Sequence, residues 1–225
     1  MDNGPGPDGR QPGCRRTPGV KLKGLKYFKA NSSVWSWLVS LVPLLLIITG
    51  LPCTGKTTLG LRLAGELRLP FVHKDGIKEL LFERIGWRDR TYSKQLSLAS
   101  YDVLYYFIES LLRAGESLIV ESNFKPDIDT AKFLDLAERM PFRPCQILLQ
   151  ADGEVLLERF KHRAESGLRH PGHVDHLTLE ELQPVLFRGR EDPLRIGGQV
   201  IQVDTTDFDA IDYSGLYRTL AELFN

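Results

Sequence analysis

Cysteine is scarce in this sequence, with only Cys14, Cys53 and Cys145 among 225 residues. Their number is odd and their spacing fits no common metal-binding pattern, so neither a disulfide framework nor a zinc site is expected. A reducing, cytoplasmic setting is the simplest interpretation. Net charge is also lacking: the formal total is zero, and outside residues 1–43 there are 22 basic against 27 acidic side chains. This mildly acidic body disfavours binding to duplex nucleic acid.

An uninterrupted apolar run long enough to span a membrane is missing as well. A spanning helix needs about 20 apolar residues, whereas the run from Val34 to Ile48 is only fifteen residues long and is interrupted by Ser36, Ser40 and Pro43. Basic residues precede this run, which keeps a targeting or membrane role open as an alternative. Because the end of the run also fits a buried strand, we expect no membrane partner. Residues 1–43 are interpreted as a disordered extension, or as the product of a start codon assigned too early, ahead of one domain at 44–225.

From Leu44 onward, apolar segments of strand length alternate with segments of helical period. The alternation implies right-handed crossovers and a mainly parallel sheet covered by helices on both faces, which is the α/β class. A loop rich in His and Gly is expected at 166–176. Five strands are predicted at 44–49, 70–75, 117–124, 145–152 and 199–206, with helices at 55–68, 76–84, 93–114, 128–139, 153–165 and 213–224.

The segment ITGLPCTGKTTL, residues 48–59, contains the pattern G-x-x-x-x-G-K-[ST] between a predicted strand and a predicted helix, which is the context that a phosphate-binding P-loop needs. The two glycines let backbone N–H groups turn toward phosphate oxygens, and the helix N-terminus adds positive potential. Lys56 then reaches the β and γ phosphates, and the Thr57 hydroxyl is a ligand for Mg²⁺. Cys53 is interpreted as a loop-filling thiol. The residues predicted to bind ATP are Gly50, Leu51, Pro52, Cys53, Thr54, Gly55, Lys56, Thr57 and Thr58.

Two classes of P-loop protein lack their expected signals here. A GTPase would carry a guanine-reading N-K-x-D segment after a later strand, and ILLQADGE has none. A motor or helicase usually has a longer body and an acidic pair at the end of a second key strand. The corresponding segment LIVESNF has a single carboxylate, Glu121.

Four segments together resemble the zeta-toxin-like and chloramphenicol-phosphotransferase-like P-loop kinases, a group that also neighbours gluconate and polynucleotide kinases. They are LLIITGLPCTGKTTL, FVHKDGIKELLF, LIVESNF and RFKHRAESGLRHPGHVD, and the likeness covers about residues 44–206. The resemblance implies a three-layer P-loop kinase fold with a lid, using ATP and Mg²⁺. None of the four segments identifies the phosphate acceptor.

The resemblance implies roles for two strand-end carboxylates. Asp75 matches the acidic position that such kinases place against the acceptor hydroxyl, where a carboxylate orients the alcohol and accepts its proton. The alternative is a cap for a helix beginning at Gly76. Glu121 stands where the group often has Asp, so either metal or acceptor contact remains open, as does a simple ion pair with Lys125. Asn123 is a further candidate for acceptor contact.

Arginines near the histidine-rich loop match a lid pattern. Arg159 and Arg163 are four residues apart on one helix face, and Arg169 follows in the loop. In the resembling kinases, lid arginines stabilise charge on the transferring phosphate and exclude water; Arg163 is the principal candidate, and a solvated basic face is the alternative. Four histidines also invite a metal interpretation, but their spacing fits no common zinc pattern. These are His162, His170, His173 and His176.

The sequence thus predicts an ATP-dependent kinase acting on a hydroxyl of a small molecule. Lys56, Asp75 and Arg163 are the predicted catalytic residues. Two alternatives stay open: a regulatory ATPase acting through a protein partner, and a kinase for nucleic-acid ends, which the acidic body disfavours. The oligomeric state and the acceptor are not predicted.

Overall fold

The computed structural model describes residues 42–167 and 169–224. Of the predicted N-terminal extension, only Val42 and Pro43 fall within this range. In the described part, no helix combines the length and the apolar character needed to cross a membrane.

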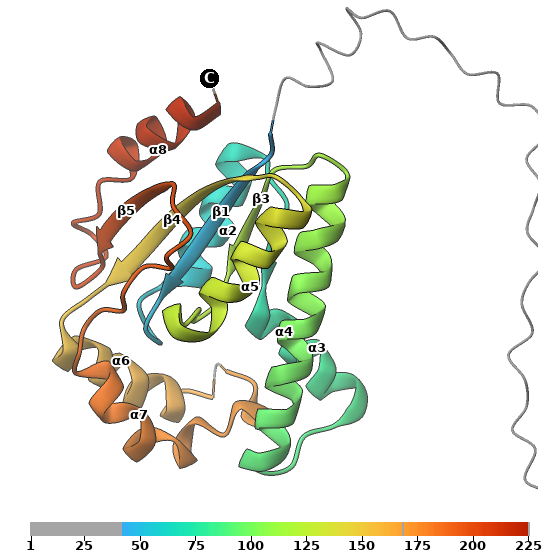
Figure 1. Cartoon of the computed structure of the whole chain (residues 1–225). Helices are drawn as coiled ribbons and strands as arrows, with labels where there is room; N and C mark the ends of the chain where they lie inside the picture. Colours follow the sequence, from blue (N-terminus) through green and yellow to red (C-terminus); the bar gives the residue numbers. More distant parts are fainter. Residues whose placement is uncertain (1–41, 168, 225) are drawn as a thin grey trace, which may run out of the picture. The chain divides into compact units, whose positions relative to one another are not determined.

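Five parallel strands form one sheet in the order β2-β3-β1-β4-β5 (Figure 1). The central strand β1 is buried along its whole length, as its continuous apolar sequence predicts for a strand covered on both faces. The strands are β1 Leu44–Gly50, β2 Phe71–His73, β3 Leu118–Glu121, β4 Arg143–Gln150 and β5 Gln199–Asp204.

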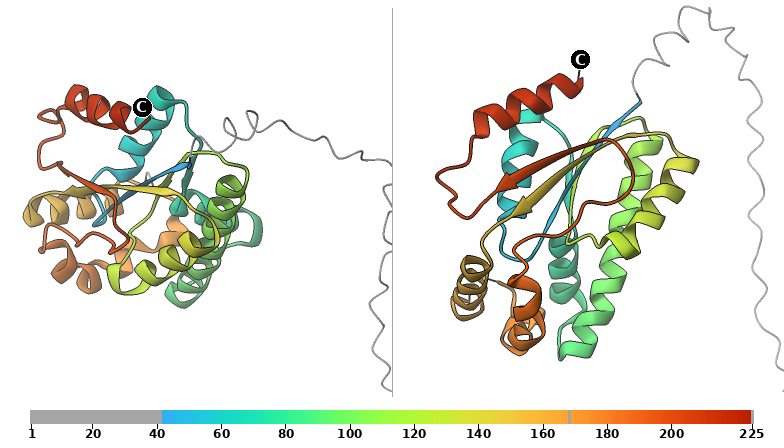
Figure 2. Two further views of the ribbon diagram at one scale, coloured as in Figure 1. Left: turned by 45° about the horizontal axis from the view of Figure 1, so that its top comes forward. Right: turned by 60° about the vertical axis from the view of Figure 1, so that its left-hand side comes forward.

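Helices cover both faces of the sheet, and Figure 2 shows α2 and α8 on one side and α4 and α5 on the other. Successive side chains of a strand point to opposite faces. Accordingly, Leu46 and Ile48 of β1 pack in the first core and Leu45 and Ile47 in the second. These helices are α2 Lys56–Leu67, α8 Tyr213–Ala221, α4 Arg90–Arg113 and α5 Pro126–Arg139, with a 3-10 turn η3 at Glu222–Phe224.

Helices α6 and α7 lie beyond the carboxyl end of the sheet (Figure 1). A third, smaller core joins them to the phosphate-binding loop through Leu51, Phe160 and Leu186. This cluster ties the predicted lid to the loop beneath it. The elements of this region are α6 Gly153–Glu165, η1 Pro171–His173, η2 Asp175–Leu177 and α7 Leu179–Leu186, and helix α3 Lys74–Ile85 follows β2.

The predicted elements are present, with corrections at their ends. The second strand stops at His73, so Lys74 and Asp75 belong to the first turn of α3 instead. Helix α4 begins at Arg90, three residues earlier than predicted, because the Asp89 carboxylate accepts a hydrogen bond from the Tyr92 N–H at 2.9 Å and caps it. Helix α7 was not predicted, since it is short and contains Pro184.

Candidate active site

The loop between β1 and α2 has a backbone that only small residues permit. Gly50 has φ +143°, and a Cβ atom there would meet the Leu149 carbonyl oxygen at 2.3 Å. Gly55, at φ +83°, is left-handed and starts α2. The Thr54 hydroxyl donates to the Leu51 carbonyl oxygen at 2.9 Å and closes the turn. The P-loop pattern therefore forms the strand–loop–helix unit that its sequence predicts.

The Lys56 side chain folds over this loop and is 7% exposed. Its Nζ donates to the Leu51 carbonyl oxygen at 2.8 Å. Burial lowers the pKa of the Lys56 ammonium, and the carboxylates of Glu121 and Asp75 oppose that shift. Cys53 and Lys56 line one cavity next to the loop. Burial raises the pKa of the Cys53 thiol despite nearby cations. A protonated thiol is a poor nucleophile, which agrees with the interpretation of Cys53 as loop-filling.

Thr57 and Glu121 lie side by side beneath the loop. Thr57 Oγ1 donates to Glu121 Oε2 at 2.8 Å, and Glu121 is 5% exposed at the end of β3. Within residues 42–167 and 169–224, no ion pair joins Glu121 to Lys125. A hydroxyl and one carboxylate, completed by phosphates and water, make a common Mg²⁺ site in nucleotide enzymes. The donor chemistry of this pair therefore fits a magnesium ion.

Asp75 faces the cavity from the first turn of α3. The helix is capped by His73, whose Nδ1 accepts a hydrogen bond from the Gly76 N–H at 3.0 Å, so the interpretation of Asp75 as the cap is wrong. One Asp75 oxygen lies 3.1 Å from Lys74 Nζ, and the other accepts a hydrogen bond from Arg169 Nη2. Burial raises the pKa of the Asp75 carboxyl, but Arg169 and Lys74 outweigh burial and hold that pKa well below its usual range.

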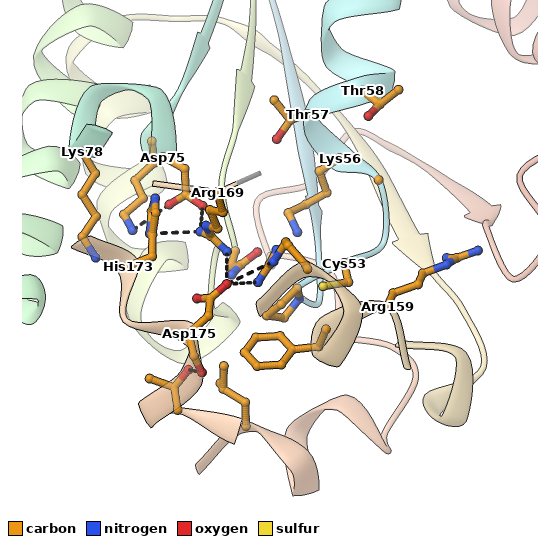
Figure 3. Close-up of a pocket in the computed structure, with 18 of the residues that line it drawn as sticks. Cys53, Lys56, Thr57, Thr58, Asp75, Lys78, Arg159, Arg169, His173 and Asp175 are labelled. Carbon is orange, nitrogen blue, oxygen red and sulfur yellow. Dashed lines mark hydrogen bonds and ion pairs between the residues drawn. The ribbon is translucent and has the colours of Figure 1, made fainter. Parts of the chain in front are cut away.

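The two C-terminal lid arginines converge on Asp175. Its Oδ2 accepts hydrogen bonds from Arg163 Nε at 3.1 Å and from Arg169 Nη1 at 3.3 Å. Arg169 thereby bridges Asp175 on the lid and Asp75 on α3 (Figure 3). Asp175 therefore positions both guanidinium groups, and Arg169 joins the histidine-rich loop to α3.

The loop histidines make separate contacts rather than one cluster. His173 Nε2 lies 2.9 Å from Glu79 Oε1, and burial lowers the pKa of the His173 imidazole despite that carboxylate. His170 Nε2 lies 3.2 Å from Glu83 Oε1, and its ring stacks on Phe82. Both histidines thus join the lid to α3. Among the described residues, no group of three or more His, Cys, Asp or Glu side chains is arranged to hold a metal ion.

Arg159 turns away from the other lid arginines. Its guanidinium donates to the carbonyl oxygens of Thr205 at 2.8 Å and Thr206 at 3.0 Å, and lies 3.9 Å from the ring centre of Phe208. Phe208 in turn contacts the loop close to Gly55. Both residues line the cavity, and Figure 3 shows Arg159 at the end opposite Asp75.

These groups line one cavity of about 680 Å³. Most of the predicted site residues face it, while Gly50, Leu51, Thr54 and Glu121 support the lining from behind. Residues that line the cavity but that the sequence reasoning did not single out for the site are Lys74, Lys78, Arg90, Ser97, Phe160, His173, Asp175, Thr178, Leu182 and Phe208. The signal for Asp175 was present, because it ends the lid-like segment RHPGHVD. Lys78 and Arg90 carried no such signal.

Comparison with known proteins agrees with this geometry. The model of a family described as an AAA domain matches residues 45–188. The chain belongs to this family. A solved structure described as that of a candidate kinase from Chloroflexus aurantiacus is 39% identical, with a TM-score of 0.73, over 81% of this chain and 98% of that one. The likeness places this family member in the P-loop kinase group that the sequence resembles.

Weaker likenesses extend across other kinases. A gluconokinase from Sinorhizobium meliloti is 19% identical with a TM-score of 0.44, covering 81% of this chain and 97% of that one. A shikimate kinase from Bacteroides thetaiotaomicron is 14% identical with a TM-score of 0.40, covering 80% and 96%. Likenesses this weak carry no argument. No curated protein matches the chain.

Proposed function

We propose that this family member is a kinase that transfers the γ-phosphoryl group of ATP to a hydroxyl group of a small molecule. The observation that carries the proposal is the shared cavity, whose lining combines a phosphate-binding loop with the Asp75 carboxylate and with the arginines Arg163 and Arg169. A protein that only bound nucleotide would not need the Asp75 carboxylate across the cavity from the phosphate-binding loop. The arrangement matches the requirements of phosphoryl transfer, which are positioning and charge stabilisation.

On the donor side, the loop amides and Lys56 would hold the β and γ phosphates. Thr57 and Glu121 would hold Mg²⁺, which when bound neutralises phosphate charge during transfer. Lys56 now rests on the Leu51 carbonyl oxygen, so nucleotide binding requires it to exchange that neutral acceptor for phosphate oxygens. The exchange is favourable because hydrogen bonds between charged partners are the stronger ones.

On the acceptor side, Asp75 would orient the hydroxyl. The oxygen of the acceptor hydroxyl forms the new bond to the γ-phosphorus, and the bond from that phosphorus to the bridging oxygen of ADP breaks. The hydroxyl proton passes to the Asp75 carboxylate. Arg169 and Lys74 hold Asp75 in its charged form before the reaction. When the γ-phosphate draws Arg169 toward itself, Asp75 loses one counter-charge and becomes a stronger base.

The test is phosphoryl transfer from γ-labelled ATP into a metabolite extract, with mass-spectrometric identification of the labelled product. The full chain should label a small molecule, and Lys56→Ala should not. Lys161→Ala, which removes an exposed lysine of α6, is the matched control and should behave as the unmodified protein. ATP consumption with no labelled acceptor would contradict the proposal and favour a regulatory ATPase.

A further inference from the structure

Lys78 is a buried lysine that the proposed transfer reaction does not use. It lies on α3 beyond Asp75, on the side away from Lys56 (Figure 3), and is 4% exposed. Its Nζ donates to Ser93 Oγ at 2.9 Å and lies 5.2 Å from the ring centre of Phe82. An ammonium group has three N–H donors. In the part of the chain that the structure describes, one donor of Lys78 has a hydrogen-bond acceptor, and no carboxylate forms an ion pair with it.

Arg90, the first residue of α4, lines the same end of the cavity. Its Nη2 donates to both carboxylate oxygens of Glu181, at 3.1 and 3.0 Å. Its Nε is buried and has no hydrogen-bond partner within the described residues. Unpaired buried donors are rare in folded proteins, because each forfeits the hydrogen bond it made in water. This end of the cavity therefore holds spare N–H donors on two cationic side chains.

The charges at this end do not balance. Lys74, Lys78, Arg90 and Arg169 contribute four cations to the lining. Asp75 is shared between Lys74 and Arg169, Arg169 also pairs with Asp175, and Arg90 pairs with Glu181. Within the described residues, Lys78 is therefore the member of this group that no carboxylate pairs with. A buried cation without a counter-charge is costly, and a bound anion removes the cost. The cavity is thus electrostatically incomplete where the acceptor would sit.

We propose that the phosphate acceptor is an anionic alcohol, whose carboxylate or phosphate group binds Lys78 and Arg90 while its hydroxyl faces Asp75. This inference rests on the proposed kinase function and names the substrate class of that site. The Ser93 hydroxyl positions Lys78 and also donates to the Gly172 carbonyl oxygen at 2.8 Å. Since Gly172 belongs to the lid turn η1, anion binding at Lys78 and lid closure involve the same contact network.

The proposal is tested with the full chain and a metabolite extract divided on an anion-exchange resin. The retained fraction holds acids and phosphate esters, and the flow-through holds neutral and cationic compounds. We expect labelled phosphate from ATP to enter an acceptor of the retained fraction. An acceptor found in the flow-through would overturn this inference and leave the kinase function standing. Transfer into neither fraction would contradict the kinase function itself.

Treatment of the retained fraction with a phosphatase, followed by removal of the phosphatase, separates the two anion chemistries. Acceptor activity that survives belongs to a carboxylate, and activity that is lost belongs to a phosphate ester. Either result agrees with the proposed class.

Variants then test the two cations. Lys78→Met should raise the amount of retained fraction needed for half-maximal rate by about tenfold or more, because a charge-assisted hydrogen bond is lost. The half-saturating ATP concentration should change little, and Lys78→Arg should restore most of the acceptor affinity. Acceptor half-saturation is measured in Arg90→Met as well, because Arg90 is only half-buried and its replacement is less disruptive to folding than that of Lys78. Lys94→Met is its control, since Lys94 also approaches Glu181, at 3.7 Å, but does not line the cavity.

Thermal unfolding shows whether each variant is folded before its kinetics are compared. Unchanged acceptor saturation in both Lys78→Met and Arg90→Met would overturn the proposal. A structural role alone for Lys78 predicts a lower melting temperature, with equal effects on ATP and acceptor saturation, and that result would also overturn it.

Discussion

The two ends of the cavity are built in different ways. The proposed donor end is one continuous stretch of chain, in which β1, the loop and the start of α2 follow one another. The acceptor end is assembled from the first turns of α3 and α4 and from the lid, and side chains supply its contacts. The proposed donor end is thus fixed by local geometry, whereas the proposed acceptor end depends on tertiary packing.

The largest effect is expected at the donor end. Lys56→Ala removes the one buried ammonium over the loop's Leu51 carbonyl, and should lower the transfer rate by about 10³-fold or more. The labelled-product assay measures it, beside Lys161→Ala. Turnover retained in Lys56→Ala would show that the donor end does not work as a P-loop.

Asp75→Asn separates the two ends most sharply. It keeps the shape of the side chain and removes the charge that orients the acceptor, so transfer should fall by roughly 10²-fold or more. ATP affinity, measured by calorimetry, should stay within about threefold, because the loop is untouched. Asp102→Asn, an exposed position on α4, is the isosteric control. An equal loss of ATP binding would place Asp75 at the donor end instead.

Asp175→Asn tests whether the lid positions Arg163 and Arg169 for transfer between the two ends of the cavity. Without this carboxylate, Arg163 and Arg169 lose their shared partner, and kcat should fall by about tenfold through poorer positioning. Arg169 keeps its contact with Asp75, so acceptor saturation should change less than kcat. Glu180→Gln, at an exposed lid position, is the control. An Asp175→Asn enzyme with unchanged kcat would show that the arginines need no common anchor.

The same contrast explains how far the sequence could be interpreted. Alternation of apolar runs with helical segments predicts the five parallel strands, and the P-loop pattern predicts the loop with its Lys56 and Thr57. The predicted end of β2 at Asp75 was wrong, because the His73 side chain caps α3 and the helix begins at Lys74. Lys78 and Arg90 belong to no sequence motif. Their place in the site follows from the cavity that they line, which only the folded structure shows.

The smallest expected effect is a pH dependence confined to the acceptor end. Burial lowers the pKa of the Lys78 ammonium to about 7, and the neighbouring cations Lys74, Arg169 and Arg90 act in the same direction against Asp75. Above pH 7 the free protein therefore loses the Lys78 proton, which an anionic acceptor requires.

Acceptor binding must then take up that proton, so the half-saturating amount of the retained fraction should rise as the pH rises from about 7 to 9. The total rise should stay below the roughly tenfold effect of Lys78→Met, because the neutral amine still donates hydrogen bonds. Below pH 7 the side chain is already charged, and this dependence should flatten. Lys78→Arg keeps its charge across the range and should lose the dependence, while its ATP saturation follows that of the unmodified protein. Equal slopes in the two proteins would assign the titration to another group and would show that acceptor binding does not depend on the charge of Lys78.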